Sequence, residues 1–204
     1  MIPALPRPER AGLRRLILLR HGETTAGTGR LLGSSCDLGL SERGRSQAAA
    51  SGRRLLGRTV VGWVISSPQR RALETAALAF PGLPVIIDER LREQDFGELT
   101  GLTWLEAKAR FGQRARAWRT SGAPPPGGES PATLRARVAD AASSAMLLPL
   151  GDPRSEVILV THHTPIRSLI ATSRGWPISE WRRVHVPYGG VLTVGCGAPG
   201  STRR

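Results

Sequence analysis

The sequence lacks any long apolar segment and has little cysteine. No uninterrupted apolar run approaches the ~20 residues of a membrane-spanning helix, so we expect no membrane segment. The two cysteines, Cys36 and Cys196, have no nearby metal-ligand partners and give no sign of a disulfide framework, which fits the reducing cytoplasm. The opening residues carry proline and charge where a signal peptide needs an apolar core. We therefore expect a cytoplasmic protein with a flexible leader over 1–14 and a flexible tail over 197–204.

Acidic residues are also scarce. The chain has 16 Asp and Glu against 29 Lys and Arg, which gives a formal net charge of +13. Such a balance favours an acidic partner, and nucleic acid, an anionic membrane surface and a phosphorylated metabolite all qualify. Nearly all of the positive residues are arginines spread along the chain, in runs no longer than pairs such as Arg70-Arg71 and Arg182-Arg183. We interpret most of them as a solvated surface.

Short apolar runs alternate with helical patterns along the 204 residues. The sequence predicts strands at 16–19, 60–65, 85–87, 157–160 and 192–194, and helices at 42–56, 68–79, from the capping box Thr103–Glu106, from Ser130-Pro131 to about 148, and from Thr164-Pro165. This alternation is typical of a parallel sheet that is covered on both faces. We predict one α/β domain over 15–196, with a mainly parallel central sheet and helices on both faces.

Histidine follows two of the predicted strands. Arg20-His21 and His162-His163 each come directly after a buried strand, and Arg71 lies in the helix after a third. Because ligands bind at the carboxyl ends of parallel strands, these residues are expected to face one crevice. An arginine next to a divalent metal ion would repel it and make metal binding less favourable. The planar guanidinium group instead forms paired hydrogen bonds to phosphate oxygens. We therefore predict a phosphate site without a metal, which the backbone of Gly22 can approach closely.

Five ordered segments carry a family resemblance. They are LRHGET at 19–24, SSPQRRALETA at 66–76, LREQDFGELTG at 91–101, PPGGES at 125–130 and VTHHTPIR at 160–167. Together they resemble the histidine phosphatase superfamily, also called the phosphoglycerate mutase-like family. The segments are most similar to its α-ribazole phosphatase-like and broad-specificity acid phosphatase branches.

The resemblance implies a role for each matched residue. His21 would be the nucleophile, Glu93 the general acid and base, and His162 the second catalytic histidine. The phosphate would be bound by Arg20, Gly22, Thr24, Gly27 and Arg71. His163 is interpreted either as a substrate contact or as a packing residue, since the family commonly has glycine there. Arg167 is interpreted as fixing its loop, and the tryptophans as packing residues.

The implied activity is a phosphomonoesterase that acts on a small phosphorylated metabolite without a cofactor. A phosphoglycerate mutase shares the same intermediate, but its segment between the acid and the second histidine is longer than that between Glu93 and His162. A nucleic-acid-binding module would use the positive charge, yet it gives no purpose to Glu93 or to the placed histidines, so nucleic acid is not the expected partner. The sequence leaves open whether the chain forms a homodimer.

Overall fold

A five-stranded sheet organises the computed structural model, which describes residues 15–195. The strands are β1 (Arg15–Arg20), β2 (Val60–Ser66), β3 (Val85–Ile87), β4 (Ser155–Thr161) and β5 (Val191–Gly195), in the order β3-β2-β4-β1-β5. All neighbours pair in parallel except β5, which runs antiparallel to β1. The predicted leader, the predicted tail and Cys196 lie outside the described residues.

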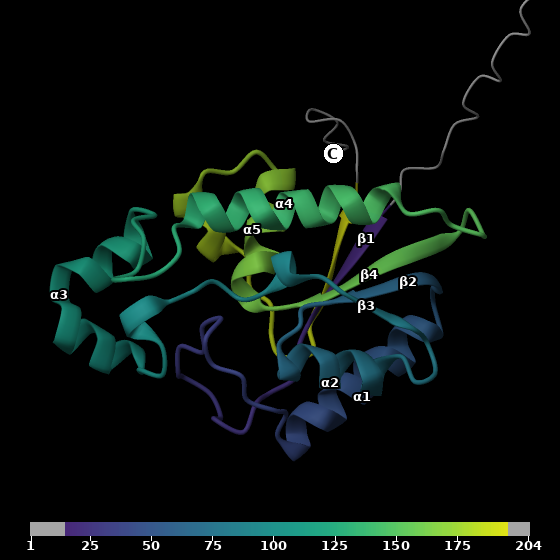
Figure 1. Ribbon diagram of the computed structural model, residues 1–204, viewed down its shortest axis with the longest axis horizontal. Helices are drawn as coiled ribbons and strands as arrows, with labels where there is room; N and C mark the ends of the chain where they lie inside the picture. The colour runs from purple at the N-terminus through teal and green to yellow at the C-terminus, as the bar shows by residue number, and fades with distance from the viewer. Residues whose placement is uncertain (1–14, 196–204) are drawn as a thin grey trace, which may run out of the picture.

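Helices cover both faces of the sheet, as the sequence predicts (Figure 1). The α-helices are α1 (Glu42–Leu56), α2 (Arg70–Ala79), α3 (Trp104–Thr120), α4 (Pro131–Leu147) and α5 (His163–Ser173), with short 3-10 helices η1 (Glu89–Leu91), η2 (Gly97–Leu99) and η3 (Ile178–Arg183). Helices α1 and α2 lie on one face, and α4 and α5 lie on the other. Within residues 15–195, no helix is both long enough and apolar enough to cross a membrane.

The alternation of side chains along β1 explains why its apolar run has no polar interruption. Leu16 and Leu18 pack into the core on the α4 and α5 side, whereas Ile17 and Leu19 pack into the core on the α2 side. Successive residues of a strand point to opposite faces, so a strand that is covered twice needs apolar residues at every position. The same packing places the carboxyl end of β1, and therefore His21, beside the end of β4.

Three helix starts follow their predicted caps. The Ser41 side chain accepts a hydrogen bond from the Gly44 N–H, Thr103 and Glu106 form the reciprocal capping box, and Ser130 caps α4 ahead of Pro131. Each cap satisfies backbone donors that have no partner inside the helix. The predicted positions are therefore confirmed for α1, α3 and α4.

Two predicted helix starts are wrong by one or two residues. Ser67-Pro68 does not open α2, because Gln69 occupies the cap position and the helix begins at Arg70. The helix α5 begins at His163, one residue before the predicted Thr164 cap, because His162 is its N-cap residue. The side chains of Ser67 and His162, which follow the two strand ends, are instead hydrogen-bonded to each other.

The helix α3 carries a kink that the sequence pattern does not indicate. Gly112 has φ +49° and ψ −117°, which interrupts the helical backbone. Glycine adopts positive φ without the steric penalty of a side chain. The kink redirects the second half of α3, in which Trp118 packs edge-on against Phe96, with ring centroids 5.2 Å apart.

Candidate active site

His21 lies buried at the carboxyl end of β1, with only 4% of its surface exposed. Its backbone N–H donates to the Thr161 carbonyl at 3.0 Å, which ties the turn after β1 to the end of β4. Its Nδ1 lies 2.7 Å from the carbonyl oxygen of Gly22. A carbonyl only accepts, so Nδ1 carries the proton and donates it. The other ring nitrogen, Nε2, therefore keeps its lone pair.

The electrostatic surroundings keep His21 neutral. Burial lowers the pKa of the imidazole well below 6.5, and the positive charges of Arg71 and then Arg20 lower this pKa further. Burial disfavours the charged form of a group, and a nearby cation disfavours a second positive charge. A neutral imidazole with a free Nε2 is a nucleophile at neutral pH.

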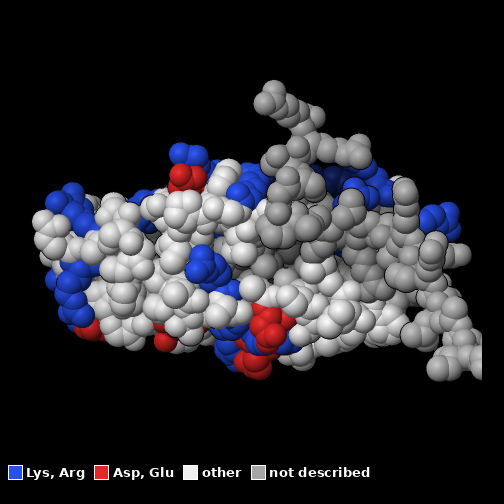
Figure 2. All heavy atoms as spheres, turned by 90° about the horizontal axis from the view of Figure 1, so that it is seen from above, with Lys and Arg blue, Asp and Glu red and all other residues white. Residues whose placement is uncertain are grey.

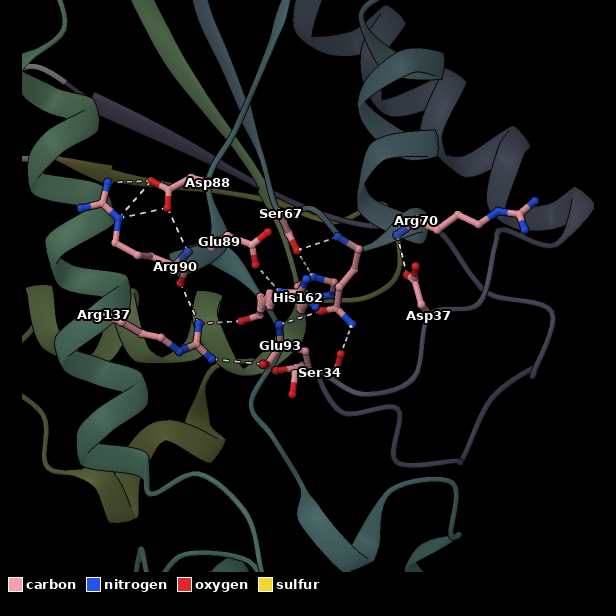
Figure 3. Close-up of polar contacts among 12 residues, drawn as sticks. Ser34, Asp37, Ser67, Arg70, Asp88, Glu89, Arg90, Glu93, Arg137 and His162 are labelled. Carbon is pink, nitrogen blue, oxygen red and sulfur yellow. Dashed lines mark hydrogen bonds and ion pairs between the residues drawn. The ribbon is translucent and has the colours of Figure 1, made fainter.

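His162 lies beside His21, with ring centroids 5.0 Å apart. Its Nδ1 accepts a hydrogen bond from Nε of Arg71 at 3.2 Å. Its Nε2 lies 2.8 Å from Oγ of Ser67 (Figure 3). A guanidinium group only donates, so the His162 proton is on Nε2, which donates to Ser67. Burial, followed by the charge of Arg71, lowers the pKa of His162 well below 6.5. His162 is thus neutral in this arrangement, whereas a role in neutralising phosphate charge would need it protonated.

Arg71 and Arg20 place positive charge on two sides of the histidines. Arg71 is fully buried and donates to the backbone carbonyls of Leu32, Gly33 and Cys36. Arg20 donates from Nη1 to the Val186 carbonyl at 2.6 Å, and its guanidinium stacks over the ring of Tyr188 at 4.0 Å. The Nε of Arg20 is buried without a hydrogen-bond partner in the described part of the chain.

Glu93 provides the carboxylate of the site. It follows η1 and is only 5% exposed. Its Oε1 accepts from the Gln94 N–H at 2.8 Å, and its Oε2 accepts from the Thr164 N–H at 3.4 Å in the first turn of α5. Its own backbone N–H donates to the Gln69 side chain at 2.9 Å. Backbone donors on two segments therefore fix the direction of the carboxylate.

Arg137 of α4 holds the loop that carries Glu93. Its guanidinium donates to the carbonyls of Arg90 at 2.6 Å, Arg92 at 2.8 Å and Glu93 at 3.1 Å, and reaches from α4 across to this loop in Figure 3. The same guanidinium forms a two-pronged ion pair with Glu129, with both N···O distances at 2.7 Å. Glu129 belongs to the PPGGES segment, so this segment acts through Arg137 on the position of the acid.

A cavity of about 520 Å³ opens above these groups. Arg20, His21, Glu93 and His163 line it, together with side chains of α3, α5 and η3. His162 lies beneath the lining, where it contacts both His21 and Arg71. Burial, followed by the charges of Arg20 and Arg167, lowers the pKa of His163 to about 2, so its ring is neutral. His163 thus lies where the substrate-contact interpretation, one of the two left open by the sequence, needs it.

Arg71, whose donors are bound to His162 and to backbone carbonyls, does not line the cavity, and its contact with phosphate stays a prediction. The other predicted phosphate contacts do not line the cavity either. The Gly22 N–H already donates to Oγ1 of Thr75 at 3.1 Å, and a Cβ added at Gly22 would lie 2.3 Å from the Gly44 carbonyl oxygen. The close approach of α1 is therefore the reason that this position requires glycine. Thr24 is buried, and Gly27 adopts φ +72° in a loop, where an added Cβ would have no neighbour within 4 Å. Phosphate binding by these three residues stays a prediction.

The sequence does not predict several of the lining residues. Arg167 does fix its loop, by donating to the Val184 carbonyl at 2.8 Å, but it also lines the cavity. Trp104, Trp118 and Trp181 line the cavity as well, although the sequence favours a packing role for them. The lining also includes the arginines at positions 30, 119 and 182. The only signal for them in the sequence is the pair at 182–183, which resembles ordinary surface charge.

A buried neutral histidine, flanked by arginines and faced by a carboxylate, defines the chemistry of enzymes that transfer phosphoryl groups through histidine. Across residues 15–195, no group of three or more His, Cys, Asp or Glu residues is arranged to hold a metal ion. The family model of the histidine phosphatase superfamily, branch 1, matches residues 16–202, and the chain belongs to this superfamily.

Relatives in the superfamily include both phosphatases and mutases. A glucosyl-3-phosphoglycerate phosphatase of Mycolicibacterium vanbaalenii is 37% identical over 186 residues, covering 83% of this chain and 78% of the relative. A 2,3-bisphosphoglycerate-dependent phosphoglycerate mutase of a Methylobacterium species is 36% identical over 170 residues, covering 79% of this chain and 81% of the relative. The crystal structure of an Escherichia coli protein proposed to be an α-ribazole-5′-P phosphatase has a TM-score of 0.79 at 26% identity, and the match covers 95% of each chain.

Proposed function

We propose that the protein is a phosphomonoesterase that forms a phosphohistidine on His21 and uses Glu93 as general acid and base. The observation that carries the proposal is the state of His21: a buried neutral imidazole whose Nδ1 is committed to the Gly22 carbonyl. Its Nε2 is the free nucleophile, on the lining of a cavity that also presents Arg20 and Glu93.

The first step transfers the phosphoryl group to the enzyme. Nε2 of His21 forms a bond to phosphorus as the bond between phosphorus and the ester oxygen breaks. Glu93, protonated at this stage, gives its proton to the departing oxygen, so that an alcohol leaves. The Nδ1 hydrogen bond to the Gly22 carbonyl stabilises the positive charge that the ring gains.

The second step restores the enzyme. Water attacks phosphorus, the bond between phosphorus and Nε2 breaks, and Glu93 takes a proton from the water. Inorganic phosphate leaves, His21 becomes neutral again, and Glu93 is protonated for the next cycle. The positive charges of Arg20 and Arg71 stabilise the negative charge on the oxygens of the transferring phosphoryl group in both steps. The N–H donors of Arg71 are bound to His162 and to backbone carbonyls. Arg71 therefore stabilises the phosphoryl oxygens through its positive charge and not through direct hydrogen bonds.

A phosphoglycerate mutase is the second candidate, because the Methylobacterium relative carries that name. The two activities share the phosphohistidine and differ in whether water or a second hydroxyl group accepts the phosphoryl group. The short segment between Glu93 and His162 favours water as the acceptor. Because the mycobacterial relative is named for glucosyl-3-phosphoglycerate, this compound is the first substrate to test.

A nucleic-acid-binding function has less support. On the face drawn in Figure 2, basic side chains form separate groups, and several of these lie beside acidic side chains. A groove that tracks a nucleic acid backbone would present a continuous basic stripe. Five arginines, at positions 20, 30, 119, 167 and 182, instead line the cavity beside His21.

The deciding experiment measures release of inorganic phosphate from a panel of phosphomonoesters, including glucosyl-3-phosphoglycerate, beside an assay for 3-phosphoglycerate mutase activity. We expect phosphate release without mutase activity, and loss of the release in His21→Ala. Mutase activity that exceeds phosphate release would replace the proposal by its second candidate. Tight, salt-sensitive binding of nucleic acid without either activity would reject both.

A further inference from the structure

The cavity carries more positive charge than one phosphate group requires. Besides Arg20 and Arg30, three arginines from separate elements line its wall: Arg119 in the last turn of α3, Arg167 on α5 and Arg182 on η3. Among the residues that the structure describes, the only acidic side chain in this lining is Glu93. Those three arginines are called the basic wall below.

Unlike many arginines of this protein, the three of the basic wall form no ion pair within residues 15–195, although the charge of Glu93 in the same lining attracts Arg167. Arg30, elsewhere in the lining, lies 3.8 Å from Glu106, and Arg183, the neighbour of Arg182, pairs with Glu180 at 3.1 Å. No ion pair joins the basic wall to any described carboxylate. Unpaired arginines are ordinary on an open surface, but a shared cavity wall brings like charges together.

The electrostatics of the wall reflect this crowding. Burial, followed by the charge of Arg182, lowers the pKa of Arg167 to about 10. Burial and then the charge of Arg119 lower the pKa of Arg182. The positive charges of the wall therefore repel one another. An anion bound among them would relieve this repulsion, which is a gain that a neutral ligand cannot supply.

Two of the three guanidinium groups, those of Arg167 and Arg119, are also held in place. Arg167 uses Nε to donate to the Val184 carbonyl at 2.8 Å, which leaves its terminal nitrogens for another acceptor. Arg119 stacks over the ring of Trp104 at 4.1 Å. A guanidinium fixed by stacking or by one hydrogen bond loses less conformational freedom when it binds an anion. Ile178 adds apolar surface to the same lining, which suits the uncharged body of a substrate.

We propose that Arg119, Arg167 and Arg182 form a second anion subsite, which binds a carboxylate or second phosphate of the substrate whose phosphate ester lies at His21. The proposal rests on the phosphomonoesterase function and narrows its substrates to compounds with two anionic groups. Paired hydrogen bonds from guanidinium groups fit both carboxylate and phosphate, so the two sources of the second charge are separated by experiment.

The test compares matched substrates that differ in one charged group. In the first pair, 3-phosphoglycerate has a carboxylate where glycerol 3-phosphate has a hydroxymethyl group. In the second pair, hexane-1,6-diol bisphosphate has a second phosphate that its monophosphate lacks, at a greater distance from the reacting phosphate. The ratio of kcat/KM within each pair reports the contribution of the second anion. We expect the doubly anionic member of at least one pair to be preferred by about tenfold, as for one charge-assisted hydrogen bond.

Variants assign this preference to the subsite. Arg119→Gln and Arg182→Gln should each lower the ratio in the preferred pair by up to about tenfold. Arg116→Gln and Arg183→Gln are the matched controls, because they remove exposed arginines of α3 and η3 that do not line the cavity. These controls should keep the wild-type ratio. Thermal unfolding of all four variants checks that they are folded.

The outcomes separate the subsite from the activity itself. Phosphate release from the singly anionic substrates, with ratios near one in both pairs, overturns the subsite and leaves the phosphomonoesterase intact. A wild-type preference that survives in Arg119→Gln and Arg182→Gln, or equal losses for both members of a pair, also overturns it. No phosphate release from any of the four substrates or from the phosphomonoester panel rejects the function on which the subsite rests.

Discussion

Acidification from pH 7 to pH 5 should strongly destabilise the folded protein, because the site holds three neutral histidines, two of them buried and one half-buried. His21, His162 and His163 all have pKa values lowered below 6.5, in each case by burial first, and by Arg71 or Arg20 next. The unfolded chain binds protons at these histidines as the pH falls through about 6.5, while the folded chain does not. Their contribution to stability is therefore complete above this pH and is lost below it.

The magnitude follows from this difference in proton binding. Each histidine that stays neutral in the folded state lowers the free energy of unfolding by about 1.4 kcal/mol for each pH unit below 6.5. At pH 5 the loss is about 2 kcal/mol for each fully buried histidine, and about 5 kcal/mol for the three, since His163 is partly exposed and contributes less. A loss of this size is comparable with the whole stability of many domains.

Urea unfolding at pH 7, 6 and 5 measures the effect. The hydrogen bond from the Arg90 side chain lowers the pKa of Asp88, so the contribution of this carboxylate is lost only at pH values more acidic than this window. His163→Gln should reduce the pH dependence, whereas His185→Gln, at an exposed position outside the cavity lining, should leave it unchanged. An unfolding free energy that stays constant from pH 7 to pH 5 would show that the folded protein does not hold these histidines neutral.

Three further predictions concern catalysis. Glu93→Gln should slow formation of the phosphohistidine from alkyl phosphates by about 10² or more and from p-nitrophenyl phosphate much less, because a phenolate leaves without a proton; equal losses in single-turnover measurements would remove Glu93 from the acid role. Arg137→Met should lower the unfolding free energy by about 3 kcal/mol, because it leaves Glu129 unpaired. The same variant releases the Glu93 loop and should therefore slow the hydrolysis of alkyl phosphates more than that of aryl phosphates. Arg135→Met, at an exposed position of the same helix, should have neither effect. Chelator should leave the rate unchanged, because Arg20 and Arg71 supply the positive charge that a metal would otherwise provide; a loss restored by added magnesium, zinc or manganese contradicts this.

The sheet can be predicted from the sequence because its physical cause is local. The apolar runs at 16–19 and 157–160 have strand length, and each is followed directly by a polar turn. Strands of a parallel sheet present their carboxyl ends at one edge, so the sequence predicts that His21 and His162 meet, and their rings do lie 5.0 Å apart. Helix caps such as Ser41 are local in the same way.

The cavity wall cannot be predicted because it depends on tertiary packing. Arg119, Arg167 and Arg182 come from three elements, and the kink at Gly112 redirects the second half of α3, which carries Arg119. The need for glycine at position 22 also cannot be predicted from neighbouring residues, because it comes from the close approach of the α1 backbone. Residues brought together by packing have no fixed spacing in the sequence.

Phosphoryl transfer through His21 can be observed by trapping the covalent intermediate. The enzyme is mixed with a phosphate-labelled substrate, quenched in alkaline detergent within one turnover, and digested for mass spectrometry, since a phosphohistidine is stable to base and labile to acid. The phosphoryl group should be found on His21, should turn over with the substrate, and should be absent from His21→Ala. Label that persists in His21→Ala, or steady phosphate release by that variant, would contradict a phosphoryl transfer through this histidine.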